Sequence, residues 1–102
     1  MSERLARSTR FEVRVTGALR RNTGALYMAL HMIWKMDSVT EIDGGSGLMA
    51  VGDGHMWDNQ STQKIADRLG HAALGSDPDC QVSVVVYDLE PVEIESYTYS
   101  NA

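Results

Sequence analysis

Apolar and polar residues alternate along the first extended segment of the chain. Phe11, Val13 and Val15 are separated by polar side chains between Arg10 and Thr16. A period of two is typical of a strand that buries one face. Residues 10–16 are therefore predicted to form a strand.

Four later segments extend this β pattern. Residues 39–43 and 48–51 flank a Gly-rich turn and predict a hairpin. The nearly continuous valines of 81–87 predict a central strand covered on both faces. Residues 92–99 alternate again, and Pro91 just before them favours an edge position, with acidic and tyrosine side chains on the outer face.

Two segments instead carry a helical period. Within 16–36, apolar residues fall on two faces of one helix, and a helix of this kind is either deeply buried or shares its second face with a partner. The first face holds Leu26, Leu30, Ile33 and Trp34, and the second holds Met28, Met32 and Met36. Asn22 or Thr23 is the preferred start. Residues 58–74 predict a second helix, with Asp58, Asn59 and Ser61 as possible caps and Gly75 at its end.

The order of these elements is β–α–β–β–α–β with one more strand. It predicts an α+β fold of the ferredoxin-like βαββαβ sandwich type. In such a sandwich, two helices cover one face of an antiparallel sheet; here the extra strand would form a C-terminal edge. Residues 10–102 are predicted to be a single α+β domain, preceded by a flexible basic arm at 1–9.

Composition narrows the class of protein. The 102 residues suit one domain, and the single cysteine, Cys80, cannot form an internal disulfide. No secretory signal pattern is visible, and the apolar stretch 25–36 is too short to span a bilayer. We therefore expect a protein without a membrane segment in the cytoplasm of the expressing or host cell.

Charge is unevenly distributed. The formal net charge is −5 at pH 7, yet seven of the nine Lys and Arg residues lie within 1–36. Such asymmetry indicates either an electrostatic partner or local cancellation within the fold. A nucleic-acid interface is one hypothesis, because a basic arm can neutralise phosphates. Its candidate residues are Arg4, Arg7, Arg10 and Arg14.

Catalytic and metal-binding patterns are sparse. The three histidines make no metal-ligand spacing, and the run of glycines at 44–47 lacks the lysine and the following helix of a phosphate-binding loop. We expect no metal and no cofactor. His55 follows Gly-Asp-Gly, and Asp53 could orient it as a general base, so this pair is the one catalytic candidate.

Large soft apolar side chains favour a binding surface. Methionine is frequent at adaptable interfaces, and tryptophan and tyrosine are frequent in interface hot spots, although a Met-filled core would explain the same composition. We expect a protein partner, and a homodimer is plausible. The candidate contact residues are Asp88, Glu90, Glu93, Glu95, Tyr97, Tyr99, Met28 and Met32.

The leading functional hypothesis is a small non-catalytic binding or regulatory module, such as an inhibitor or modulator of a larger assembly of the kind that phages encode. An acidic, tyrosine-bearing surface would meet a basic patch on the partner. The second hypothesis is a small cofactor-free enzyme of the dimeric α+β barrel type. Its candidate pocket residues are Tyr27, His31, His55 and Trp57.

Overall fold

The strands form one antiparallel sheet of five, in the order β2-β3-β1-β4-β5. The computed structural model describes residue 5 and residues 9–17, 23–57, 59–75, 79–88 and 93–101. The strands are β1 (Thr9–Thr16), β2 (Ser38–Ile42), β3 (Gly47–Asp53), β4 (Gln81–Asp88) and β5 (Glu93–Ser100). The helices are α1 (Thr23–His31) and α2 (Thr62–Leu74), with short 3-10 turns η2 (Asp43–Gly45) and η3 (His55–Trp57).

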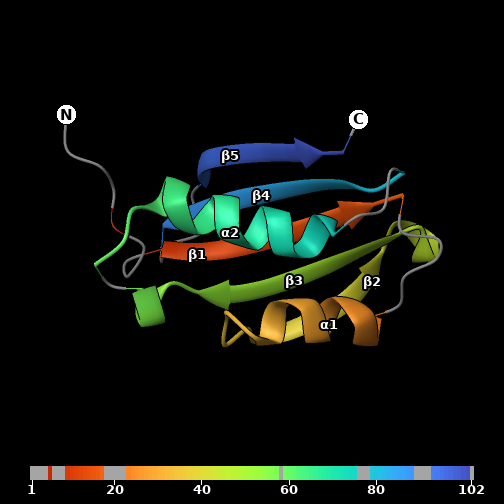
Figure 1. Ribbon diagram of the computed structural model, residues 1–102, viewed down its shortest axis with the longest axis horizontal. Coiled ribbons are helices and arrows are strands. Elements are labelled where there is room, and N and C mark those ends of the chain that lie inside the picture. The colour runs from red at the N-terminus through yellow and green to blue at the C-terminus, as the bar shows by residue number, and fades with distance from the viewer. Residues whose placement is uncertain are drawn as a thin grey trace.

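The first strand lies in the middle of the sheet. β1 pairs with β3 on one side and with β4 on the other, so that Val13 stands opposite Ala50 and Val84. β1 and β2 run in the same direction with β3 between them, and β3 and β4 run in the same direction with β1 between them. Both helices lie in front of the sheet in Figure 1. The fold is therefore α+β, as the sequence predicts.

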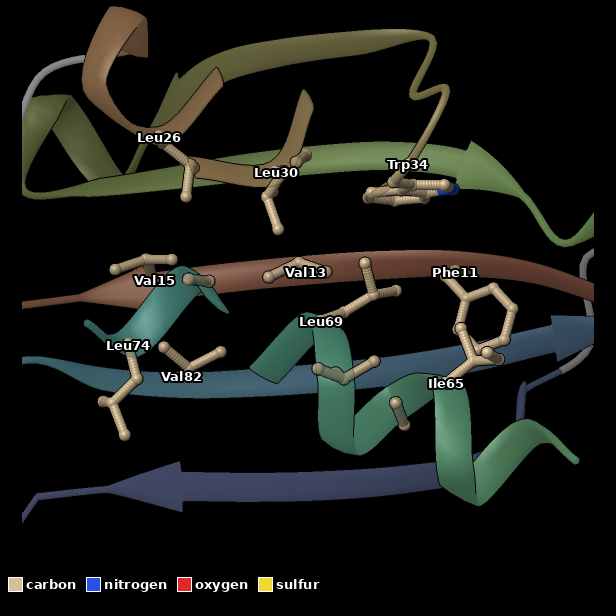
Figure 2. Packing of buried hydrophobic residues seen from close by; sticks show 14 of the residues in the cluster. Phe11, Val13, Val15, Leu26, Leu30, Trp34, Ile65, Leu69, Leu74 and Val82 are labelled. Atoms are coloured by element: carbon tan, nitrogen blue, oxygen red, sulfur yellow. The ribbon is translucent and has the colours of Figure 1, made fainter. Parts of the chain in front are cut away.

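The core fills the space between the sheet and the two helices. Its members are alternate residues of the inner strands together with one stripe of each helix. Figure 2 shows Leu26 and Leu30 of α1 and Ile65 and Leu69 of α2 pointing toward the β1 side chains. Fully buried residues include Phe11, Val13, Val15, Leu26, Leu30, Ile65, Leu69, Val82, Val84 and Val86. Each buried side chain of this size contributes about 1.5–3 kcal/mol.

The valine-rich strand is covered on one face only. Val82, Val84 and Val86 are fully buried beneath the helices, whereas Val85 between them is only half-buried. The prediction that both faces are covered is therefore wrong for the described residues. The helices lie on one side of the sheet, and the other side carries polar side chains of β1 and β5.

The first helix is shorter than its apolar pattern predicts. α1 begins at Thr23 as expected but ends at His31, and the backbone N–H groups of Ile33 and Trp34 both donate to the carbonyl of Leu30. The indole of Trp34 is almost completely buried. Because this ring packs into the core next to β3, the chain leaves the helical path.

Other boundaries differ by a few residues. β1 begins at Thr9, which is fully buried, so the flexible arm predicted for 1–9 cannot include this residue. α2 begins at Thr62, after Ser61, whose hydroxyl accepts from the backbone N–H of Lys64 at 3.3 Å. Gly75 ends α2 with a positive φ of 59°. Within the described residues, neither helix has the length and apolar character that crossing a bilayer requires.

Candidate partner-binding groove

Two adjoining depressions open at the end of α1, beside η3. The first has a volume of about 450 Å³ and the second about 420 Å³, and they share Lys35, Met36 and Met56. Together they form what we call the α1–η3 groove. Its other lining residues are Tyr27, His31, Met32, Ile33, Trp34, Asp37, Asp53 and His55.

Stacked aromatic rings support the groove from below. The rings of Trp34 and Trp57 lie 6.0 Å apart at 29°, and Phe11 meets Trp57 edge-on at 5.8 Å. The indole N–H of Trp34 donates to the carbonyl of Asp53 at 3.0 Å. A Cβ atom at Gly52 would come within 2.7 Å of the Trp34 ring. Glycine at this position of β3 is therefore what allows the indole to lie against the strand.

Backbone contacts fix the loop that forms one wall. The N–H of Lys35 donates to the thioether sulfur of Met56 at 3.2 Å, and the N–H of Asp37 donates to the carbonyl of Val51 at 2.7 Å. Arg10 forms an exposed ion pair with Asp37 at 2.6 Å. These contacts connect residues 35–37 to both η3 and β3, so the wall is held at two points.

Exposed apolar side chains surround the groove. In the part of the chain that the structure describes, five large apolar residues are exposed; Tyr27, Met32 and Met56 line the groove, and Met28 lies on α1, the helix that carries Tyr27. Met32 is 81% exposed and Met28 is 62% exposed. Met28 is on α1, and Met32 is the first residue after this helix. Only Leu26 and Leu30 of α1 are buried in the core, so the outer face of α1 is apolar and uncovered.

Neither histidine ring of the groove is oriented by a carboxylate among the described residues. The ring of His31 stacks on Tyr27 with centroids 5.2 Å apart. Asp53 accepts a hydrogen bond at 3.1 Å from the backbone N–H of His55, not from its imidazole. The carboxylate therefore caps the η3 turn. The predicted orientation of the His55 ring by Asp53 is not what the structure shows.

The tyrosines of the last strand face α2 and not outward. Tyr99 donates to Asp67 at 2.7 Å, Tyr97 donates to Glu95, and the hydroxyl of Thr62 donates to the same Glu95 carboxylate at 2.7 Å. The prediction of an outer face for Glu95, Tyr97 and Tyr99 is therefore wrong. Phenol rings can bury their apolar body when a partner satisfies the hydroxyl; for Tyr99 this partner is Asp67 of α2, and for Tyr97 it is Glu95 of β5, which is bonded to α2 through Thr62.

These contacts also change the acidity of the phenols. Burial, followed by the hydrogen bond to Glu95, raises the pKa of Tyr97 to about 12. Burial and the hydrogen bond to Asp67 raise the pKa of Tyr99 still further above its ordinary value. Both shifts favour the neutral phenol. The two tyrosines are consequently structural links between β5 and α2.

The remaining predicted contact residues are separated from the groove. Glu93 is exposed and stands opposite Tyr87, and Asp88 is half-buried at the end of β4. Glu90 lies outside the described residues. Of the partner-binding candidates that the structure describes, Met32 alone lines the α1–η3 groove, and Met28 is exposed on α1.

Two of the nucleic-acid candidates, Arg10 and Arg14, already form ion pairs with carboxylates of the same chain. Arg10 pairs with Asp37, and Arg14 donates to Glu12 through Nε at 3.1 Å and through a terminal nitrogen at 2.9 Å. The hydrogen bond to Glu12 and its charge raise the pKa of Arg14. Arg4 and Arg7 lie outside the described residues. Neighbouring carboxylates therefore balance the charges of Arg10 and Arg14. This is local cancellation within the fold, the second explanation of the uneven charge distribution.

Sequence patterns missed the polar wall of the groove. Lys35 and Met36 were assigned to the end of a helix, whereas they line the groove together with Asp37 and His55. The signal in the sequence is the pair of tryptophans, Trp34 and Trp57, each near the end of its segment. Two such anchors could have indicated that both loops pack against the same part of the core.

In the described ranges, no group of three or more His, Cys, Asp or Glu residues is placed to hold a metal ion. No family model matches the chain, and no curated protein or solved structure matches it.

Proposed function

We propose that the chain is a small non-catalytic binding module, which holds a protein partner in the α1–η3 groove. The observation that carries this proposal is the gathering of the exposed side chains of Tyr27, Met32 and Met56 around one depression, to which Met28 adds exposed apolar surface on α1. Contiguous exposed apolar surface on a small domain is typical of interaction sites. Methionine side chains adapt to the shape of an apolar partner, and the rigid Trp34–Trp57 stack gives them a firm base.

The groove favours a partner segment with bulky apolar anchors beside a carboxylate. Asp37 already pairs with Arg10, and Asp53 caps η3. Lys35 is exposed and has no ion pair among the described residues, so it is the cation that a partner's acid can meet. A Leu, Phe or Ile anchor would fill the depression between Tyr27 and Met56. This surface takes the place of the acidic, tyrosine-bearing one that the sequence favoured.

Binding accounts for the groove better than catalysis does. An enzyme of the α+β barrel type needs a closed pocket between helices and sheet, and that space is filled by fully buried side chains such as Phe11, Val13 and Leu69. The two depressions are open to solvent, and neither His31 nor His55 has its ring oriented by a described carboxylate.

We further propose that the first four strands and both helices form a ferredoxin-like sandwich, with β5 as the added edge strand. The support is that each helix connects two strands of the same direction that are separated by one antiparallel strand. This fold serves many functions, so it is compatible with a regulator or inhibitor of a larger assembly and does not select one.

Selection from a displayed peptide library tests the binding proposal. Enriched peptides should carry large apolar anchors next to Asp or Glu. The double variant M28S/M32S should bind them at least about tenfold more weakly, because it removes the lining side chain of Met32 and the exposed apolar side chain of Met28 on α1. Its matched control is Q63S/K64S, which changes two exposed positions of α2 and should bind as the wild type does.

Charge reversal adds a second readout. Lys35→Glu should weaken peptides with an acidic flank, and replacing that acid by lysine in the peptide should restore binding to the variant. If no apolar peptide is enriched, or if M28S/M32S binds the selected peptides as tightly as the control does, the proposed function is wrong.

A further inference from the structure

The last strand leaves a long edge of the sheet unpaired. In the order β2-β3-β1-β4-β5, β5 pairs with β4 on one side and with no described strand on the other. It is eight residues long, and Figure 1 shows it along the margin of the sheet farthest from α1. An edge strand presents free backbone donors and acceptors to any strand that can approach.

The two edges of this sheet differ in how they discourage pairing. β2 is five residues long, contains Glu41 and lies between Asp37 and Asp43. Short length and charge are the usual protection of an edge. β5, by contrast, has no charge and no proline from Ser96 to Ser100, and it carries Tyr97, Thr98 and Tyr99, which favour extended structure. β2 therefore has the features that discourage pairing, and residues 96–100 of β5 do not have them.

Contacts with α2 hold β5 in place. The ring of Tyr99 lies against Gly70, where a Cβ atom would come within 2.4 Å of it, and beside the His71 ring at 5.3 Å. Its hydroxyl bonds to Asp67, and Glu95 accepts from Thr62. The side chains on the helix side are thus fixed, while Ser96 and Thr98 on the other side are exposed. A preorganised strand loses little conformational entropy when another strand joins it.

We propose that β5 pairs antiparallel with β5 of a second copy of this chain, so that one continuous sheet spans the dimer. A two-fold axis near the middle of the strand sets the beginning of each β5 against the end of the other. Glu93 and Glu95 then face the uncharged half of the second strand, and no carboxylates are opposed. A symmetric pair also covers both unprotected edges at once and closes the assembly.

The strength expected from this pairing is moderate. An antiparallel ladder over eight residues forms about eight hydrogen bonds between the copies. Peptide addition to a sheet edge uses the same backbone contacts, so a strand from another protein is the competing occupant. α1, whose end lines the groove, lies toward the opposite edge of the sheet (Figure 1), and the dimer therefore does not depend on the binding proposal.

The mass of the full-length protein in solution, measured by sedimentation over a dilution series, tests the inference. The wild type should reach twice the 11.3 kDa of one chain. With the two-fold axis at Tyr97, Ser96 of each copy stands opposite Thr98 of the other, so S96K/T98K places lysines against lysines. It should raise the dissociation constant about a hundredfold or more, since opposed like charges at an interface cost several kcal/mol. The control S38K/T40K adds the same charge at exposed positions of β2 and should remain dimeric.

Mixing oppositely charged variants makes the test specific for the strand. S96E/T98E should be monomeric alone, and an equal mixture of it with S96K/T98K should restore a dimer that contains one chain of each kind. Circular dichroism of each variant checks that it is folded. A monomeric wild type, an unaffected S96K/T98K dimer, or a mixture that stays monomeric overturns the proposal. Loss of the dimer in M28S/M32S together with its survival in S96K/T98K would assign the contact to the groove instead.

Discussion

Two glycines control how closely large rings approach the backbone. Gly52 lets the indole of Trp34 lie on β3, and Gly70 lets the phenol of Tyr99 lie on α2. A glycine inside a helix costs about 1 kcal/mol relative to alanine. Its presence in the middle of α2 is explained by the ring that occupies the space of a side chain.

Replacing Gly70 by alanine should therefore destabilise the protein despite the better helix propensity of alanine. The new Cβ would lie 2.4 Å from two carbons of Tyr99, and overpacking of this kind costs about 1–3 kcal/mol. Urea unfolding measures the change. In a Tyr99→Ala background the same substitution should instead stabilise α2. A Gly70→Ala variant that is more stable than the wild type would contradict this account.

The side chains of the last strand show which feature could not be predicted from the sequence. The alternation of 92–99 is correct for a strand, but it does not say which set of side chains faces the helices. Tyr97 and Tyr99 are apolar enough to be buried and polar enough to be exposed. The choice depends on Asp67 and Thr62, which lie more than 30 positions away in the chain. A hydrogen bond between residues so far apart in the chain leaves no pattern in the local sequence.

At the scale of elements, β5 and α2 are joined by ionisable groups whose charge state matters. Tyr97 has a pKa raised to about 12, above the ordinary value of about 10 for a free phenol. A raised pKa in the folded state means that the neutral phenol is favoured by folding. The stability that this contributes is complete below about pH 10 and is lost as the pH rises toward 12.

We therefore expect the free energy of unfolding to fall between about pH 10 and 12. Tyr97→Phe removes one titrating group and should make this fall shallower, although Tyr99 continues to contribute to it. Unfolding by denaturant at a series of alkaline pH values measures both slopes. Equal slopes in the two proteins would show that the Tyr97 phenol is not linked to folding.

Element boundaries were predictable where local pattern and tertiary packing agree. The valines of β4 and the alternation of β1 gave strands within about two residues of those observed, because side-chain period and burial coincide there. α1 ends early because burial of Trp34 outweighs the helical pattern of 32–36. The groove was not predictable as a whole, since its walls come from two separate loops.

For the whole molecule, the single thiol reports on global opening. Cys80 is 2% exposed and belongs to the core cluster under the helices. A buried thiol reacts only when the structure around it opens. Labelling with an aromatic disulfide should be slow in water and should accelerate with denaturant in parallel with unfolding. A Gln63→Cys variant, exposed on α2, should label at once; equally fast labelling of Cys80 would show that this end of the core opens independently.

The paired indoles beneath the groove have an optical consequence. Trp34 and Trp57 are the two tryptophans of the chain, and their rings are 6.0 Å apart. Rings this close couple their electronic transitions, so the tryptophan emission of the folded protein originates from one place. A molecule that settles over Met56 would alter that signal, whereas an event at the far edge of the sheet would leave it unchanged. The protein thus carries a built-in spectroscopic label for one of its two proposed contact surfaces.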